Sequence, residues 1–411
     1  MVSLSFKRGM LPLSNLYVRV ISLTQLIRTL GRSVVWIFVP IYLSEIGHIP
    51  FVEIGLIFFG TAMISLPFSL YGGNLIDRIG RRFAAIITPP LMGILLLTEG
   101  IVAEFHLSVI ILIATFLFFE PIASIQGIVD NVVITEETEE ADRNNSFSIV
   151  RIAANIGFSF GPAIGGFLSY LNFSLVFFIP MAITMVEWAI FARYIRNRKG
   201  MVSSGSGKME FPRHDRIFII ISVIIASSFF VAGQWGTTLT LFWSSIDHIT
   251  NREIGILYTI NGLVVVLFQV PINIMFAKVR DHFRIAAGVM IYASAFFALI
   301  FSSNFIFLIS DVVAITMAEN IISPVIYTII GKIAPRGKMG QYFGAFQLIV
   351  GFIQPMAPVM GTYLLGRFSH NTFYIWTPVL ALGIVVTMLT LKYGARAERK
   401  SLPGKVNEVE I

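Results

Sequence analysis

The sequence predicts an all-α integral membrane protein with twelve transmembrane helices in two pseudo-symmetric six-helix bundles. Only 13% of the 411 residues are charged and 56% are hydrophobic, whereas soluble domains carry roughly 25% charged residues. Apolar runs of about 20 residues, the length that crosses a bilayer, recur along the chain. Short motifs also repeat in the same order in the two halves. The predicted spans are 16–44, 52–72, 83–103, 107–133, 146–170, 173–195, 217–243, 254–276, 285–301, 304–331, 341–366 and 372–393.

Positive charges sort to one side of the predicted spans. Of the 30 Lys and Arg residues, only Arg252 and Arg367 fall on the opposite side. Because cytoplasmic loops of membrane proteins are enriched in Lys and Arg, we expect both termini in the cytoplasm and the protein in the cell membrane. The same sorting accounts for the net charge of +7 without a nucleic-acid partner. Four further arginines lie within spans: Arg19, Arg28, Arg32 and Arg151.

The longest polar break divides the chain into two halves. Residues 196–216 are rich in Gly and Ser, which is typical of a flexible linker. We therefore expect one six-helix bundle over 1–195 and another over 217–411. Internal duplication of this kind is typical of secondary transporters, with the binding site between the halves. The matches are Glu-Ile-Gly at 53–55 and 253–255, Glu120 with Glu319, and GPAIG at 161–165 with APVMG at 357–361.

The stretch GNLIDRIGRR, residues 73–82, is predicted to form the cytoplasmic turn between the second and third spans. Gly73 is expected to let helices approach closely, and Gly80 to permit a tight turn. Arg81 is expected to anchor the inner side. Asp77 has no such explanation, because orientation requires no acid there.

The pattern G-x-L-x-D-R-x-G-R-R resembles the signature that the major facilitator superfamily carries in this loop. The resemblance implies a cytoplasmic latch, in which Asp77 meets the positive N-terminal end of the eleventh span near Gly340. A carboxylate at a helix N-terminus is favoured by roughly 0.3–1 kcal/mol. Asp130, near the inner end of the fourth span, is expected to accept Arg78 or Arg81. The matching residues are Gly73, Leu75, Asp77, Arg78, Gly80, Arg81 and Arg82.

A second motif, GFSFGPAIGG, lies in the fifth span. One interpretation is a glycine-lined helix interface with a proline kink, which is common in membrane proteins. The motif also resembles the fifth-span signature of proton-coupled antiporters, which is typical of drug exporters. One departure is Ala123, because exporters of this type usually carry an arginine three residues before the pair Gln126-Gly127. The matching residues are Gly157, Gly161, Pro162, Gly165 and Gly166.

Charged residues near the middle of the spans are the main candidates for a binding site. The resemblance implies that the first, fourth, seventh and tenth spans line a central cavity. A charge at the bilayer centre costs ~2.5–3.5 kcal/mol on insertion scales, so it normally faces water or a partner. We expect Arg32 to pair with Glu120, and the alternative is a static structural salt bridge. Glu120 and Glu319 are the expected proton carriers, and Arg28 either joins the site or extends to the inner interface.

Polar and aromatic residues within the spans are further candidates for the cavity wall. We expect Gln234 and Trp36 to contact substrate. The lesser candidates are Arg151, Glu187, Asp311, Trp235, Asn261 and Gln354.

The sequence favours transport over catalysis. It has no Cys, no His-Glu-x-x-His motif and no phosphate-binding loop, so we expect no enzyme, no metal site and no cofactor. The first hypothesis is a proton-coupled exporter of small apolar or amphipathic compounds. The alternatives are an importer or facilitator of an organic anion, a sugar or another metabolite, and a transport-dead receptor or sensor. The expected partners are a small-molecule substrate, protons and the lipid bilayer, and we expect a monomer.

The predicted orientation can be tested by labelling introduced cysteines, because the chain has none of its own. A cysteine in place of Gly205 should react with a membrane-impermeant thiol reagent only after cells are permeabilised. A cysteine in place of Arg252 should react in intact cells. Labelling of position 205 in intact cells would contradict the topology.

Overall fold

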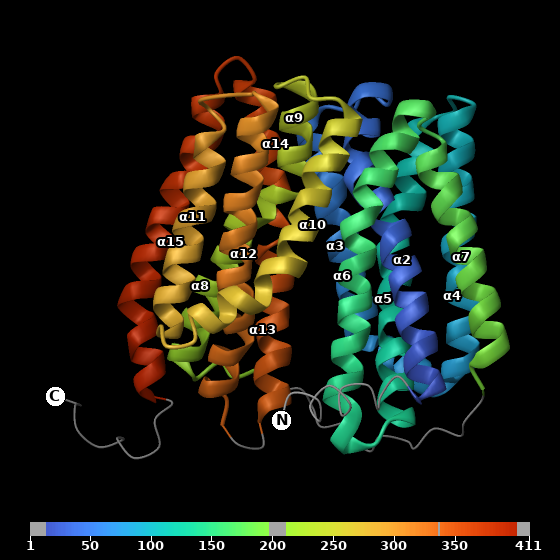
Figure 1. The fold of residues 1–411 in the computed structure, drawn as a ribbon, viewed down its shortest axis with the longest axis horizontal. Coiled ribbons are helices and arrows are strands. Elements are labelled where there is room, and N and C mark those ends of the chain that lie inside the picture. Colours follow the sequence, from blue (N-terminus) through green and yellow to red (C-terminus); the bar gives the residue numbers. More distant parts are fainter. Residues whose placement is uncertain (1–13, 197–210, 336–337, 401–411) are drawn as a thin grey trace. The chain divides into compact units, whose positions relative to one another are not determined.

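The computed structural model describes residues 14–196, 211–335 and 338–400, and all regular elements in these ranges are helical (Figure 1). The predicted linker lies mostly outside the described residues, as do both chain ends. The first half of the sequence forms α2 (Leu16–Ile41) with the π-helical turn η2 (Tyr42–Ile46), α3 (Phe51–Ile79), α4 (Arg81–Glu104), α5 (Val109–Glu137), α6 (Glu140–Leu171) and α7 (Leu175–Tyr194). The second half forms α8 (Arg216–Ala232), the 3-10 turn η3 (Gly233–Trp235), α9 (Thr237–Ser245), α10 (Asn251–Met275), α11 (Asp281–Ala298), α12 (Phe305–Ile333), α13 (Met339–Ile353), α14 (Met356–Phe368) and α15 (Thr372–Lys400).

Each of the twelve predicted spans coincides with a helix or with a pair of helices that continue one another. In the described residues, eleven of these segments are long and apolar enough to cross a membrane. The remaining segment is α11, which has 18 residues and begins with charged side chains. The prediction of an all-α, twelve-helix membrane protein is confirmed.

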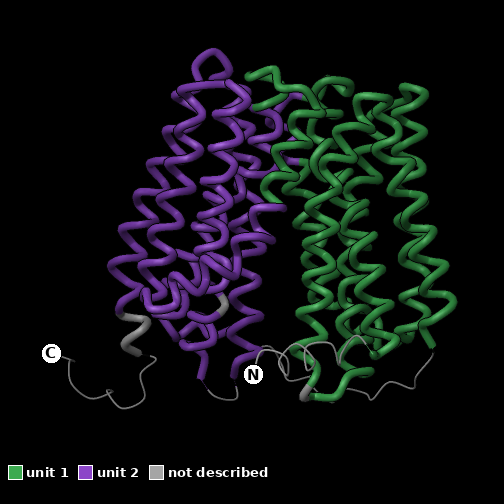
Figure 2. The backbone as a smooth tube through the Cα atoms, viewed as in Figure 1, with its two compact units in different colours: residues 1–49, 57–204, 243–262 green, residues 50–56, 205–242, 263–411 purple. Residues whose placement is uncertain are grey.

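The chain divides into two compact units whose helices pair in the same way (Figure 2). In one unit α2 packs on α6 and α7, and α4 packs on α5 and α7. In the other, α8 packs on α13 and α15, and α11 packs on α12 and α15. Because corresponding spans make corresponding contacts, the structure supports the duplication inferred from short sequence repeats.

Each unit also contains one short segment from the other half of the sequence. Residues 50–56 belong to the unit of the second half, and residues 243–262 belong to the unit of the first half. The repeated Glu-Ile-Gly motifs lie in these segments. A Cβ at Gly55 would lie 2.8 Å from the carbonyl oxygen of Pro358, and a Cβ at Gly255 would lie 2.5 Å from that of Pro162. The sequence repeats therefore mark two equivalent close contacts.

Glycines bring α6 unusually close to α2. A Cβ at Gly157 would collide with the Leu26 carbonyl oxygen, and one at Gly161 would lie 2.6 Å from the Leu30 carbonyl oxygen. Gly165 faces Phe38 and the backbone of Val34. The opposite side of the motif faces α10, where a Cβ at Gly166 would lie 2.5 Å from the carbonyl oxygen of Asn251.

The seventh and eleventh spans are interrupted next to each other. The first break is η3 between α8 and α9, and the second is Gln354–Pro355 between α13 and α14. The buried side chain of Gln234 donates from Nε2 to the carbonyl oxygen of Ala357 at 3.0 Å. Its Oε1 accepts from the Thr238 hydroxyl at 2.8 Å. These bonds satisfy polar groups that the breaks would otherwise leave buried and unpaired.

Two predicted polar loops are much shorter in the structure. Helix α3 continues to Ile79, so Asp77 and Arg78 lie in its last turn and only Gly80 separates α3 from α4. Likewise only Thr138 and Glu139 separate α5 from α6. The acids that follow are accommodated because carboxylates are favoured in the first turn of a helix.

The glycine contact between α2 and α6 predicts a position-dependent effect of added methyl groups. Gly157→Ala should lower stability by about 1–3 kcal/mol, the usual cost of overpacking. Gly127→Ala is a matched control in α5, because a Cβ there meets nothing within 4 Å. Melting of the purified proteins in detergent measures the difference. Equal melting temperatures for the two variants would contradict the contact.

Candidate functional site

Arg32 and Glu120 form a bidentate ion pair that joins α2 to α5. Arg32 Nε donates to Glu120 Oε1 at 2.9 Å, and Nη2 donates to Oε2 at 2.6 Å. The Arg32 side chain is 49% exposed and the Glu120 side chain 21% exposed. The predicted pair is therefore formed, and it is accessible to a ligand or to water. Its two members satisfy one another within otherwise apolar spans.

One turn earlier on α2, Arg28 lies in a buried cluster with two carboxylates. Nη1 donates to Glu187 Oε1 of α7 at 2.5 Å, and Nη2 donates to Asp130 Oδ2 of α5. All three side chains are less than a tenth exposed. One interpretation of the sequence was that Arg28 extends to the inner membrane interface. The structure contradicts it, because Arg28 is buried in this cluster.

Neutral side chains complete the cluster. Gln126 Nε2 donates to the second oxygen of Asp130 at 3.2 Å, and the Thr88 hydroxyl of α4 bonds to Gln126 Oε1. Gln25 Oε1 accepts from Arg28. Four helices (α2, α4, α5 and α7) thus contribute to one continuous polar network inside the first unit.

The partners predicted for Asp130 are wrong. Asp130 binds Arg28, whereas Arg81 donates to Glu136 at 2.5 Å and to Glu137 at 2.6 Å at the end of α5. Arg81 is the first residue of α4. It contacts the last turn of α5, which lies nearer the C-terminal end of that helix than Asp130 does. Arg151, one of the lesser candidates for the cavity wall, is exposed.

Of the charged residues of the predicted latch, Asp77 and Arg78 are accessible, whereas Arg81 and Asp130 are buried. Asp77 and Arg78 are exposed, and no hydrogen bond or ion pair links them to another described residue. The expected contact of Asp77 near Gly340 would join the two units, and it stays a prediction. Gly80 has a φ of 86°, which glycine adopts readily, so its role in the turn is confirmed. The role given to Gly73 is wrong, because a Cβ there would meet nothing within 4 Å, whereas at Gly72 it would lie 2.6 Å from Ile128.

Two of the other predicted site residues take part in packing. Gln234 of η3 is fully buried, and its amide bonds to Ala357 of α14 at one end and to Thr238 of α9 at the other. Trp36 is half-buried on α2, with its ring 6.4 Å from that of Phe158. Glu319 is half-buried on α12, near Tyr292 of α11. The structure does not bring Gln234 to an accessible surface.

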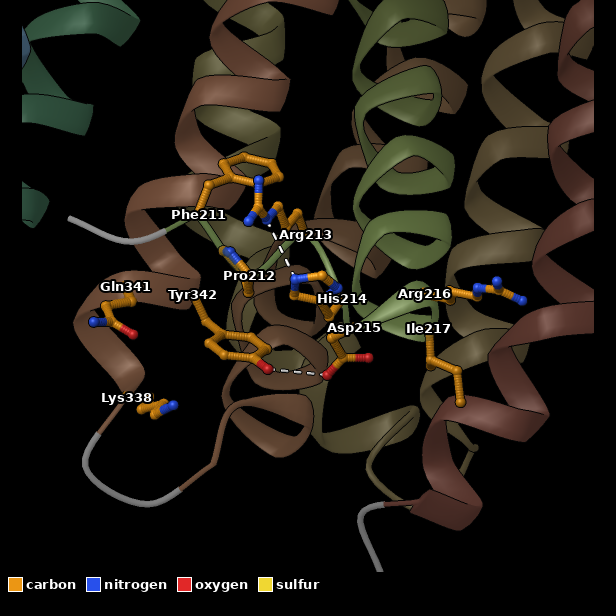
Figure 3. A pocket seen from close by; sticks show the side chains of 10 residues that line it. All are labelled: Phe211, Pro212, Arg213, His214, Asp215, Arg216, Ile217, Lys338, Gln341 and Tyr342. Carbon is orange, nitrogen blue, oxygen red and sulfur yellow. Dashed lines mark hydrogen bonds between the residues drawn. The ribbon is translucent and has the colours of Figure 1, made fainter.

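A separate cavity of about 620 Å³ lies at the start of α8 and α13 in the second unit (Figure 3). Asp215 caps α8 through the amide of Phe218 and accepts from the Tyr342 hydroxyl at 3.0 Å. Arg213 Nε donates to His214 across the same wall. Lys338 and Gln341 lie on the α13 side, whereas Arg216 extends away from Tyr342 (Figure 3). The polar groups here hold two helix ends together, and none belongs to the ion pairs of α2.

Asp247 is an acid outside the spans, in the connection between α9 and α10. Burial between α9 and α10 raises the pKa of Asp247 to about 7. Its Oδ2 is buried and has no hydrogen-bond partner among the described residues. The neutral form of this carboxyl is favoured because burial penalises its charge.

Comparison with known proteins gives matches along the whole chain. The sequence model of the Major Facilitator Superfamily matches residues 21–248 and 224–409. An uncharacterised transporter of this type, YttB of Bacillus subtilis (strain 168), is 24% identical over 390 residues, covering 92% of this chain and 95% of YttB. The quinolone resistance protein NorA of Staphylococcus aureus (strain MRSA252) is 22% identical over 385 residues, covering 91% of this chain and 96% of NorA.

Solved structures with a similar fold are also transporters by their descriptions. A crystal structure of the peptide transporter POT with sulfate superposes with a TM-score of 0.73 at 14% identity, over 93% of this chain and 95% of the other. The nucleoside transporter NupG gives a TM-score of 0.73 at 12% identity, over 93% and 99%. At these identities the likeness establishes the fold alone.

The different surroundings of Arg28 and Arg32 predict different costs of removal. Arg28→Gln leaves two buried carboxylates without their cation, and breaking such a pair costs about 3–5 kcal/mol. Arg32→Gln breaks an accessible pair, which costs about 1 kcal/mol or less. Melting of the two purified variants beside wild type measures the difference. Equal melting temperatures for Arg28→Gln and Arg32→Gln would contradict the burial of the cluster.

Proposed function

Because this chain belongs to the major facilitator superfamily, we propose that it is a secondary transporter that exports small amphipathic compounds in exchange for protons. The observation that carries the proposal is the accessible Arg32–Glu120 pair within apolar spans. An ion pair this open exposes a cation and an anion to a ligand inside the membrane. Such intramembrane charges normally mark a substrate or ion pathway.

The pair offers a simple logic for exchange. Glu120 accepts both of its hydrogen bonds from Arg32, so its charge is balanced while the pair is intact. A proton on Glu120 would release Arg32, and a polar group of the substrate would compete for the same partners. Substrate and proton then bind in alternation, which is the minimum requirement for an antiporter. Glu319 of α12 is the corresponding carboxylate in the second half and is the second proposed proton carrier.

The glycine contacts support movement by alternating access. Near their N-terminal ends, α3 contacts α14 at Gly55 and α10 contacts α6 at Gly255. A Cβ at either glycine would meet a backbone carbonyl, and one at Gly55 would also meet the Thr362 hydroxyl. Opposite the predicted cytoplasmic side, these contacts would close the pathway. In our proposal they separate as the substrate site opens outward, while Asp77 and Arg78 close the inner side. Distant similarity to a protein named for quinolone resistance favours export of drug-like compounds.

Import is the second candidate function. Arg32 is half-exposed, and an arginine fork binds carboxylates and phosphates in a bidentate manner. An organic anion could therefore replace Glu120 as its partner. A receptor without transport activity is disfavoured, because the exposed latch residues would have no task in an immobile scaffold.

Proteoliposomes with an imposed pH gradient test proton coupling. Wild type should accumulate a cationic dye or a quinolone when the gradient drives protons in the opposite direction. Glu120→Gln and Glu319→Gln should each lose this accumulation, because neither amide exchanges a proton. Retention by both variants would contradict coupling through these carboxylates. Movement of substrate by wild type only down its own gradient would favour a facilitator.

The latch can be tested with the isosteric change Asp77→Asn. Asp77 has no partner within the described residues, so the melting temperature should stay at the wild-type value. Transport should fall, because the amide lacks the charge that favours a helix N-terminus. Asn74→Ala, one turn earlier on exposed α3, is the matched control and should transport normally. Wild-type transport by Asp77→Asn would contradict the latch.

A further inference from the structure

The buried cluster of α2, α5 and α7 contains more negative than positive groups. Within the part of the chain that the structure describes, Arg28 is the only cation that contacts Asp130 and Glu187, and both carboxylates bind it directly. Their exposures are 4% for Asp130 and 0% for Glu187. If both acids were ionised, the cluster would carry one net negative charge away from water. A charge in that position is strongly disfavoured unless it is balanced.

Hydrogen bonds distinguish the two acids. Both oxygens of Asp130 accept, one from the Arg28 guanidinium and one from the Gln126 amide. Glu187 accepts through Oε1 only, and its Oε2 is buried with no partner among the described residues. Donors aimed at both oxygens stabilise an anion at Asp130. Glu187 lacks that stabilisation, so of the two acids it is the one whose neutral form the surroundings favour.

Among the described residues of the surrounding helices, no further cation balances the second carboxylate. Arg28 of α2 binds Glu187, and Asp130 of α5 binds the same guanidinium. The other charged residues on these helices pair with different residues, are acids themselves or are exposed. Arg32 of α2 binds Glu120, Arg81 of α4 binds the end of α5, Glu99 of α4 is itself a buried acid, and Arg151 of α6 is exposed.

We propose that Glu187 is a proton-binding site, and that the cluster with Arg28 and Asp130 takes up and releases one proton. The cluster is neutral with the proton bound and has one negative charge without it. Release is favoured only when movement of the helices admits water or brings another cation near. Because Arg28 and Arg32 are four residues apart on one face of α2, a shift of α2 alters both ion pairs together.

The position of this site deepens the proposed function, on which its role in coupling rests. Glu187 lies on α7, is fully buried and is not part of the accessible Arg32–Glu120 pair. It would hold a further proton of the exchange, beside those proposed on Glu120 and Glu319, while Arg32 also binds the polar group of the substrate. Proton binding by Glu187 itself does not depend on that role.

Infrared difference spectroscopy of the purified protein tests proton binding directly. The spectrum of wild type minus Glu187→Gln near neutral pH should show the carbonyl band of a protonated carboxylic acid. The control, wild type minus Glu120→Gln, should show the bands of an ionised carboxylate. Carboxylate bands for Glu187 would overturn the proposal. Glutamine has the shape and neutrality of protonated glutamate, so failure of Glu187→Gln to fold would overturn it as well.

A transport assay of Glu187→Gln distinguishes failure of this inference from failure of the proposed function. In proteoliposomes, Glu187→Gln should lose accumulation driven by a pH gradient yet retain downhill movement of the substrate. Gradient-driven accumulation at the wild-type level would overturn the coupling role of Glu187. If wild type itself failed to accumulate substrate, the proposed antiport would fall, whereas the infrared result would still decide whether Glu187 holds a proton.

Discussion

The close approach of α2 and α6 is the constraint on which the arrangement of charges depends. Gly157 and Gly161 allow the two backbones to touch, so any larger residue would push α2 away or turn it. With its rotation set by this contact, α2 directs Arg28 into the interior of the first unit, toward α5 and α7. Arg32, one turn further along, reaches α5 where the pair remains accessible. Small residues at helix contacts thus determine where charge is placed.

Two arginines on one helix face consequently meet different physical conditions. Arg32 pairs with one acid at an accessible position, where water or a ligand can replace either partner. Arg28 pairs with two acids in the interior, where neither can be lost without a large cost. Because the two ion pairs share α2, a conformational change that moves this helix changes both. In our proposal, this link connects ligand exchange at one pair with proton exchange at the other.

The sequence predicted the spans, the duplication and the Arg32–Glu120 pair, because length, positive charge and the cost of burying charge constrain them strongly. It did not predict the partners of Asp130. Those partners depend on which face each helix turns toward its neighbours. Because these spans are apolar on all faces, their sequence has little periodicity from which that face could be predicted. The end of α3 was also missed, because residues 73–79, among them the polar Asn74, Asp77 and Arg78, continue the helix rather than begin a loop. Glu187 had a signal, an acid inside an apolar run, but only the structure supplied its partner.

The central claim is transport by alternating access. It is tested most directly by a disulfide that locks the contact between α3 and α14, one turn away from Gly55. The Cβ of Phe51 lies 3.8 Å from a Cβ placed at Gly366, which is within the usual disulfide range of about 3.5–4.5 Å. The chain has no other cysteine to interfere with the pair Phe51→Cys and Gly366→Cys. The account predicts that oxidation stops transport in the double variant, that a reductant restores it, and that neither single variant responds. Undiminished transport by the fully cross-linked protein would contradict the account.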